Sequence, residues 1–188
     1  MSKKISKPQL GAVRTDAGKA EMIYFYVPGF VALARIGRGP YSKGMEAYDL
    51  LEDFHADILL NLGSEERLMF GLRNLEGKII DTLCKQHGLQ AGTVIQGVCQ
   101  VCKLGSIKYG FLNYTKGFDF SRVVNSLGRH LEKNIHEERD YESGECHLFH
   151  ALANVYILAE HIANGTGNND VKVLFKRNKG GDNGNIDG

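Results

Sequence analysis

Apolar side chains recur at three- and four-residue intervals through most of this sequence, the spacing that lines up side chains on one face of an α-helix. The pattern predicts helices over residues 43–61, from Ser64 to about Cys84, and over 91–104, 122–138 and 146–163. The alternating pattern of a half-buried strand is weak throughout. We therefore expect an all-α fold, namely a helical bundle with an irregular N-terminal segment and a flexible C-terminal tail.

The length of 188 residues fits one domain. We expect residues 1–163 to form a single helical domain, in which 105–120 make an ordered, aromatic-rich connection and Ser121 caps the helix that follows. From residue 164 onward glycine, asparagine, aspartate and lysine dominate the composition. Residues 164–188 are therefore expected to be a flexible polar tail.

The composition argues against a membrane protein and against a nucleic-acid-binding protein. The chain is 43% hydrophobic, but no run approaches the ~18 apolar residues that a spanning helix needs. Its formal net charge of +1 provides no general attraction for nucleic acid. The first residues are basic but lack the apolar region of a secretory signal, so we expect a cytoplasmic protein.

Cys99 and Cys102 form a lone C-x-x-C pair. A structural zinc site needs a second pair of ligands at compatible spacing, and the sequence has none. The pair also lies inside an apolar, helical stretch rather than at the start of a helix, where a redox motif is expected. We interpret both residues as thiols of a cytosolic helix rather than as a zinc or redox centre.

Polar residues cluster at the junction of the last two predicted helices. His147, His150 and Asn154 are spaced i, i+3 and i+7, so they share one face of a helix beside an apolar stripe. Buried polar groups need partners, because each unpaired one costs about 1–3 kcal/mol. The preceding turn supplies acidic side chains and the preceding helix supplies Arg129 and His130. If these helices are antiparallel neighbours, carboxylates and imidazoles converge near the turn.

Such a cluster suits a hard divalent cation and a phosphate chain. Carboxylates bind Mg²⁺ or Mn²⁺, which can bridge phosphate oxygens and activate water. Lys19, Lys108 and Arg129 would provide positive charge for the phosphates, and Tyr109 and Tyr114 would stack on a base.

The same residues also fit purely structural roles. His147 and His150 also fit the edge of the core, Arg129 also fits an ion pair with Asp140 or Glu142, and the tyrosines also fit simple packing. A second acidic face, on the first predicted helix, competes for the metal. It consists of Glu46, Asp49 and Asp53, at i, i+3 and i+7.

The order of these polar residues resembles the dATP/dGTP diphosphohydrolase family common in phages, which looks related to the MazG-like all-α nucleoside-triphosphate pyrophosphatases. The resemblance covers roughly a third of the chain, and residues 41–92 look like a helical insertion relative to the family. A shorter match, Gly11-x-x-Arg14-x-Asp16-x-Gly18-Lys19, lies near the N-terminus. The main motifs are Lys108-Tyr109-Gly110-x-x-Asn113-Tyr114-x-Lys116-Gly117, Arg129-His130 and Glu138-x-Asp140-x-Glu142-Ser143-Gly144-x-x-His147-x-x-His150-x-x-x-Asn154.

The resemblance implies a Mg²⁺-dependent hydrolase (Mn²⁺ being the alternative) that cleaves nucleoside or deoxynucleoside triphosphates and releases pyrophosphate. It also implies a dimer or tetramer, acting in the bacterial host cytoplasm if the chain is phage-encoded. The alternative is a non-catalytic nucleotide-binding or phage-encoded interaction protein on the same scaffold. By this resemblance, Glu138, Asp140 and Glu142 would hold the metal, and Glu142, His147 and His150 would be catalytic. Substrate would be bound by Lys19, Lys108, Tyr109, Asn113, Arg129, His130 and Asn154.

Overall fold

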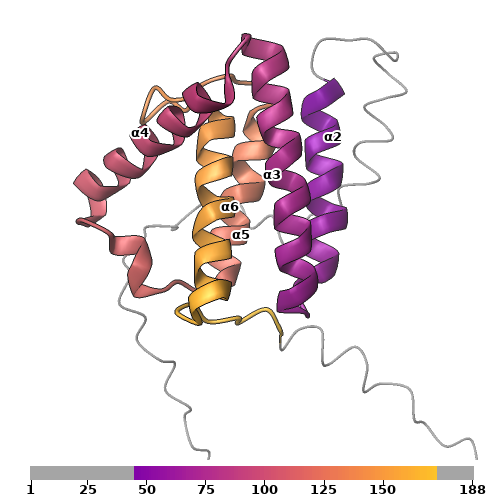
Figure 1. Cartoon of the computed structure of the whole chain (residues 1–188), viewed down its shortest axis with the longest axis vertical. Helices are drawn as coiled ribbons and strands as arrows, with labels where there is room; N and C mark the ends of the chain where they lie inside the picture. The colour runs from indigo at the N-terminus through magenta and orange to yellow at the C-terminus, as the bar shows by residue number, and fades with distance from the viewer. Residues whose placement is uncertain (1–44, 173–188) are drawn as a thin grey trace, which may run out of the picture.

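The computed structural model describes residues 45–172, and this part of the chain is all-α (Figure 1). The predicted N-terminal irregular segment and Lys19 lie outside the described residues. The described part contains no strand, only isolated bridges between Asp119 and Asn168 and between Arg139 and Cys146. Its helices are α2 (Met45–Asp53), α3 (Glu65–His87), α4 (Ala91–Tyr109), α5 (Phe120–Lys133) and α6 (His147–Asn164), with a π-helical turn η2 (Phe54–Ile58) and 3-10 turns η3 (Leu59–Asn61) and η4 (Asn113–Lys116).

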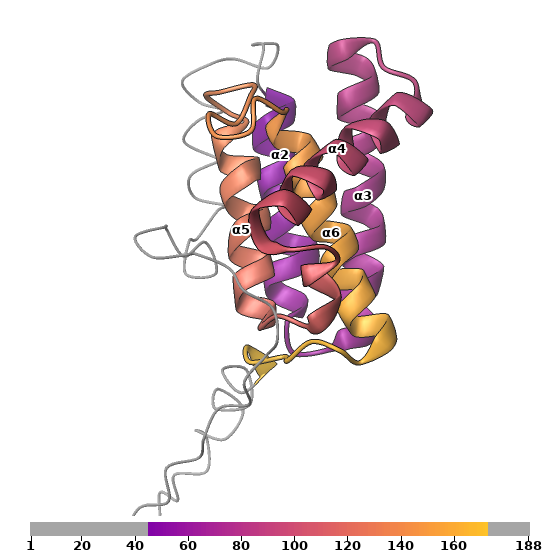
Figure 2. The ribbon, with the colours of Figure 1, turned by 90° about the vertical axis from the view of Figure 1, so that its left-hand side faces the viewer.

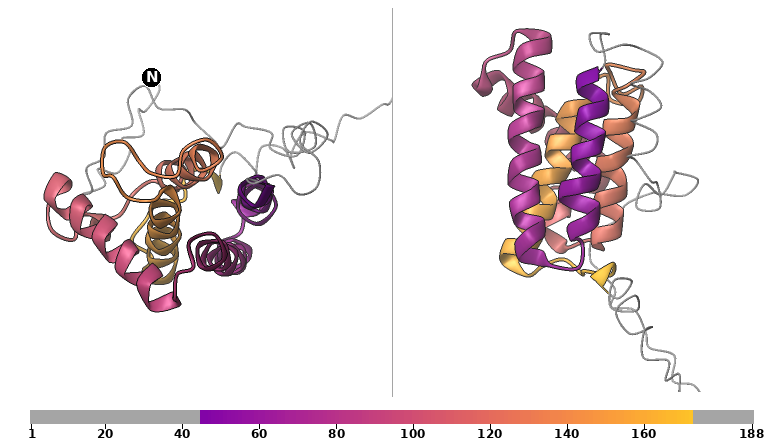
Figure 3. Two further views of the ribbon diagram at one scale, coloured as in Figure 1. Left: turned by 90° about the horizontal axis from the view of Figure 1, so that it is seen from above. Right: turned by 90° about the vertical axis from the view of Figure 1, so that its right-hand side faces the viewer.

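Four of the helices form a bundle, and α4 lies across its outside. Seen from above, α2, α3, α6 and α5 follow one another around a common centre (Figure 3). Helix α4 runs obliquely to them and packs on α6 and on α3 (Figure 2). No helix of the described chain is both long enough and apolar enough to cross a membrane.

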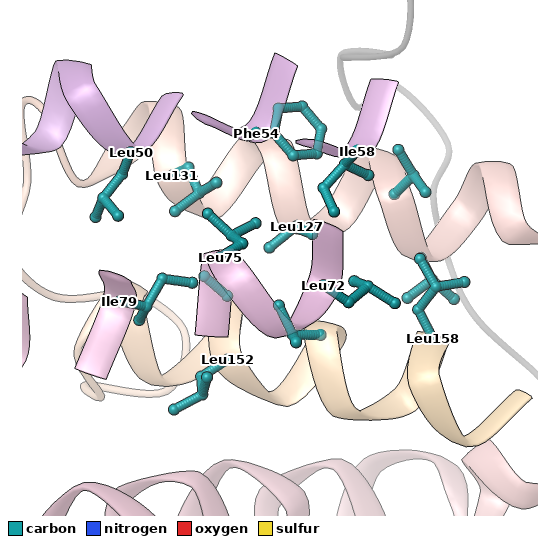
Figure 4. Close-up of a cluster of buried hydrophobic side chains, with 14 of the residues drawn as sticks. Leu50, Phe54, Ile58, Leu72, Leu75, Ile79, Leu127, Leu131, Leu152 and Leu158 are labelled. Carbon is teal, nitrogen blue, oxygen red and sulfur yellow. The ribbon is translucent and has the colours of Figure 1, made fainter. Parts of the chain in front are cut away.

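The apolar stripes seen in the sequence meet in one core (Figure 4). Phe54 and Ile58 of η2 are completely buried, as are Leu75 of α3 and Leu127 of α5. Burying a leucine, isoleucine or phenylalanine side chain contributes roughly 1.5–3 kcal/mol each. Because α2, the turns after it and α3 together supply about as many buried apolar side chains as α5 and α6, residues 45–92 are an integral part of the bundle.

The bounds of α4 and α5 differ from the sequence prediction. Helix α4 continues past residue 104 to Tyr109, so the first part of the predicted connection over 105–120 is helical, and the helix ends at Gly110, whose φ of 98° favours glycine. Helix α5 begins at Phe120 with Asp119 at the N-cap position and ends at Lys133, so Ser121 is not the cap and residues 134–138 are not helical. The lone apolar residue Ile135 extended the helical pattern in the sequence beyond the true end.

Residues 165–172, the first part of the predicted flexible tail, are packed on the bundle, and residues 173–188 lie outside the described residues. Residues 165–172 turn back onto the bundle, where Val171 is buried. The backbone of Asn168 exchanges hydrogen bonds with Phe118 and Phe120, and its side chain donates to Asp119. The carboxylate of Asp170 accepts hydrogen bonds from the backbone N–H (3.0 Å) and the hydroxyl of Ser121. Asp170 thus caps α5 from a distant part of the sequence. The polar composition of residues 164–188 did not indicate this contact.

Replacing Asp170 with alanine is expected to lower the free energy of unfolding by about 1 kcal/mol, because the first turn of α5 loses its acceptor and a favourable negative charge. The melting temperature should fall by about 2–4 °C. The control is Lys172→Ala, which removes only a long, exposed ion pair with Glu65 at 4.0 Å. Equal melting temperatures for the two variants would show that Asp170 is not a cap.

Candidate functional site

A cleft of about 650 Å³ opens between α4 on one side and α5 and α6 on the other. Its walls come from the second half of α4, from η4, from α5, from the turn over 140–143 and from α6. Many residues that the sequence singled out line this cleft, although they are up to 46 positions apart in the chain. They are Lys108, Tyr109, Asn113, Tyr114, Arg129, His130, Asp140, Glu142, His150 and Asn154.

The turn between α5 and α6 fixes Asp140. One oxygen of its carboxylate, Oδ1, accepts hydrogen bonds from the backbone N–H groups of Glu142 (3.2 Å) and Ser143 (3.0 Å) and from the Ser143 hydroxyl (3.0 Å). Gly144 has a φ of 72°, which closes the turn. An aspartate followed by serine three positions later is typical of such a side-chain-stabilised turn. The turn therefore holds the carboxylate in one orientation at the edge of the cleft.

Three imidazoles from α5 and α6 surround this carboxylate. The Nδ1 atoms of His130 and His147 are 3.0 Å apart. The rings of His130 and His150 are stacked, with centroids 4.5 Å apart and an angle of 11° between the planes. The Nε2 atom of His150 lies 2.8 Å from the Ser143 hydroxyl, which links it to Asp140. The short connection predicted from the sequence does bring these two antiparallel helices together here.

Burial and hydrogen bonding set the charges of the cluster. Partial burial acts to raise the pKa of Asp140, but the hydrogen bonds from Ser143 and the nearby His150 and His147 outweigh it, so the pKa is below the ordinary value. His147 is fully buried, and this burial lowers its pKa despite the proximity of Asp140. Near neutral pH the cluster therefore combines a carboxylate anion with a neutral imidazole.

Positive charge lines the same cleft. The Lys108 ammonium donates to the Glu142 carboxylate at 2.9 Å, and this hydrogen bond raises the pKa of Lys108. Arg129 and Lys133 of α5 also face the cleft. Lys133 was missed in the sequence, although it lies one helical turn after Arg129 and therefore on the same face.

The structure separates the carboxylates that were expected to bind metal together. Glu138 lies 3.7 Å from Nδ1 of His87, and Glu142 is paired with Lys108. Within residues 45–172, the side chains whose potential ligand atoms all lie within 4.8 Å of one another are His130, Asp140 and His147. His147 lies behind the cleft wall, in contact with His130, rather than on the cleft surface.

The competing acidic face on α2 is engaged in other contacts. Asp53 forms an ion pair with Lys78 of α3, and Glu46 accepts a hydrogen bond from Gln86 at 2.9 Å. The Cys99 thiol is exposed and the Cys102 thiol is half-buried on α4. Burial raises the pKa of Cys102, which disfavours a reactive thiolate and supports the structural interpretation of this pair.

The part of the chain that forms the cleft matches a known protein family. Residues 80–171, just under half of the chain, match the model of a family described as dATP/dGTP diphosphohydrolase, N-terminal. This segment belongs to that family. No curated protein and no solved structure matches the chain. The dATP/dGTP diphosphohydrolase segment includes every residue that lines the cleft, from Val101 to Ile157, whereas α2 and most of α3 precede it.

Proposed function

We propose that this protein hydrolyses nucleoside triphosphates, with dATP and dGTP as first candidates, to a nucleoside monophosphate and pyrophosphate. One observation carries the proposal. A single cleft inside the dATP/dGTP diphosphohydrolase segment gathers three cationic side chains, an aspartate held by its turn and two cleft-facing imidazoles. Positive groups of this kind bind a triphosphate, and the carboxylate and imidazoles supply metal-binding and proton-transfer groups.

The two ends of the cleft differ in character. The end near the turn carries the charged side chains of Lys133 and Asp140, and we assign it to the triphosphate. Near η4, Tyr114 and Phe118 supply aromatic side chains to the wall of the cleft. Aromatic faces stack on bases with roughly 1–3 kcal/mol per base. We therefore place the nucleoside beside Tyr114, near η4.

His150 is our candidate for the group that accepts a proton from the attacking water. The Ser143 hydroxyl lies between Asp140 Oδ1 and His150 Nε2, at 3.0 and 2.8 Å. A carboxylate only accepts, so the hydroxyl donates to Asp140 and accepts from the Nε2–H of His150. This arrangement puts the lone pair of a neutral His150 ring on Nδ1 and fixes the ring. Hydrolysis consumes one water, which adds to the α-phosphorus while the bond to the β-phosphate oxygen breaks.

A divalent cation, Mg²⁺ or Mn²⁺, is part of the proposal. The cluster of His130, Asp140 and His147 offers two imidazole nitrogens and a carboxylate oxygen, close enough together to bind a divalent cation such as Mn²⁺. When bound there, the cation would neutralise phosphate charge and polarise the water or the phosphate. The protein's own groups bind and orient the substrate, and Lys108, Arg129 and Lys133 hold its phosphates.

We also propose that the protein acts as a homo-oligomer. Large apolar side chains are exposed on and just beyond α4, including Ile107 at 74% and Phe111 at 82%. Exposed apolar groups of this kind favour association. Light scattering on the purified protein should give a mass above 20.8 kDa, and a monomer at micromolar concentration would rule the proposal out.

The activity is tested by incubating the purified full chain with a panel of ribo- and deoxyribonucleoside triphosphates and Mg²⁺ or Mn²⁺. Chromatography should show monophosphate and pyrophosphate in equal amounts. Release of triphosphate or of single phosphates would instead identify a different phosphohydrolase. Nucleotide-dependent thermal stabilisation without any turnover would support the alternative, a non-catalytic nucleotide-binding or interaction protein.

A further inference from the structure

We propose that His130, Asp140 and His147 form a site for a first-row transition metal, such as Mn²⁺, Fe²⁺, Co²⁺ or Zn²⁺, rather than for Mg²⁺. This inference deepens the proposed function, because it names the metal class of the same cleft. The potential ligand atoms of the three side chains lie within 4.8 Å of one another, and they come from α5, the following turn and α6. Each ligand is thus anchored by a different segment, and the cleft beside them leaves room for water and phosphate.

The orientation of His147 fits a metal ligand. Its ring is completely buried, and its Nδ1 atom faces the Nδ1 atom of His130 at 3.0 Å. Its other nitrogen, Nε2, has no hydrogen-bond partner in the described part of the chain, but a carboxylate oxygen of Glu137 lies 3.6 Å away. A carboxylate repels a nitrogen lone pair and attracts an N–H. The proton of neutral His147 therefore belongs on Nε2, and the lone pair of Nδ1 points toward His130 and Asp140.

This arrangement matches how proteins hold metal-bound histidines. A ligating imidazole usually directs its second N–H to a carboxylate or carbonyl, which fixes the ring and strengthens the metal bond. Glu137 is placed to do this for His147. Without metal, the Nδ1–H of His130 donates to Nδ1 of His147. With metal, both nitrogens offer lone pairs to the ion.

The donor set decides the metal class. Mg²⁺ takes oxygen ligands almost exclusively, whereas imidazole nitrogen suits Mn²⁺, Fe²⁺, Co²⁺ and Zn²⁺. A set of two histidines and one carboxylate with open positions is typical of such ions. The carboxylates that would complete an oxygen-only site point elsewhere, since Glu138 lies near His87 and Glu142 pairs with Lys108.

The test is metal binding by the full-length protein, measured separately from turnover. Apo protein is titrated with Co²⁺, whose visible absorption reports nitrogen ligands, and with Mn²⁺, Zn²⁺ and Mg²⁺ by calorimetry. We expect one transition-metal ion per chain, bound at least about 100-fold more tightly than Mg²⁺. Glu137→Gln should weaken binding by about 10- to 100-fold, as expected for a group that orients a ligand.

Variants of the ligands locate the site. His130→Ala and Asp140→Asn should abolish the Co²⁺ spectrum, and both residues are only half-buried, so folding should survive. His161→Ala is the control, because it removes another buried histidine of α6 that lies outside the cluster. Circular dichroism confirms that each variant is folded.

Two results would overturn the inference: Mg²⁺ binding as tight as that of Co²⁺ or Zn²⁺, or loss of binding in Glu138→Gln and Glu142→Gln instead of in His130→Ala. Turnover with Mg²⁺ alone, in a protein that binds no transition metal, would refute this inference and leave the proposed function intact. Tight Co²⁺ binding without turnover of any nucleotide would support this inference and refute the proposed function.

Discussion

Asp140→Asn is expected to lower kcat/KM for nucleoside triphosphate hydrolysis by at least about 100-fold, the scale seen when one group that stabilises developing charge is removed. The reason is charge rather than shape. The side-chain oxygen of asparagine still accepts the hydrogen bonds from Glu142 and Ser143, so the turn should keep its conformation. The negative charge that faces His130 and His147 is lost. The measurement is the initial rate of hydrolysis as a function of substrate concentration, with the nucleoside triphosphate that the unmodified protein hydrolyses fastest.

The control for this variant is Asp81→Asn, which makes the same chemical change at an exposed position of α3. It should leave kcat/KM unchanged. The two variants should have melting temperatures within a few degrees of each other, so that a loss of rate in Asp140→Asn reflects the cleft. If Asp140→Asn retained the rate of the unmodified protein, Asp140 would have no part in the chemistry and the site would have to be sought elsewhere.

Gly71→Ala is expected to cause the largest loss of stability. At Gly71 of α3, the helix passes so close to the π-helical turn η2 that a Cβ atom would lie 2.0 Å from the carbonyl oxygen of Asp57. The obstacle is backbone, which cannot rotate away as a side chain can. Overpacking costs about 1–3 kcal/mol in general, and this contact belongs at the upper end. Thermal unfolding should show a fall in melting temperature of about 6–12 °C.

Gly77→Ala provides a matched comparison on the same helix, because a Cβ atom at Gly77 meets nothing within 4 Å. Alanine is the better helix former, so this variant should gain roughly 0.5–1 kcal/mol. The opposite signs of the two substitutions test the packing of α3 against η2. Equal effects would mean that α3 and η2 are not in contact in solution.

The helical fold was predictable because the periodicity of apolar residues directly encodes which face of each helix is buried. Residues such as Leu72, Leu75 and Leu127 occupy the core that the pattern indicated. The helix ends were less predictable. The cap of α5 comes from Asp170, some 49 positions away, and the sequence near Ser121 carries no sign of that long-range hydrogen bond.

Most polar residues of the cleft, though not Lys133, were also identified in the sequence, but which of them lie close together was not. The spacing of His147, His150 and Asn154 placed them on one face of a helix, and the structure brings His150 and Asn154 to the cleft. Spacing says nothing about the conformation of a turn. Because α5 ends at Lys133, Glu138 lies near His87 and Glu142 reaches Lys108. A second carboxylate was expected beside Asp140, but the structure places His130 there.

The most direct test of the proposed function is phosphorus NMR of dATP and dGTP during incubation with the purified protein and a divalent cation, with Asp140→Asn as the blank. We expect the triphosphate resonances to be replaced by those of the nucleoside monophosphate and of pyrophosphate, in equal amounts and only with unmodified protein. Appearance of free triphosphate, or spectra that stay the same in the presence of Mg²⁺, Mn²⁺ and Co²⁺, would contradict the proposal that this cleft is a nucleotide pyrophosphohydrolase site.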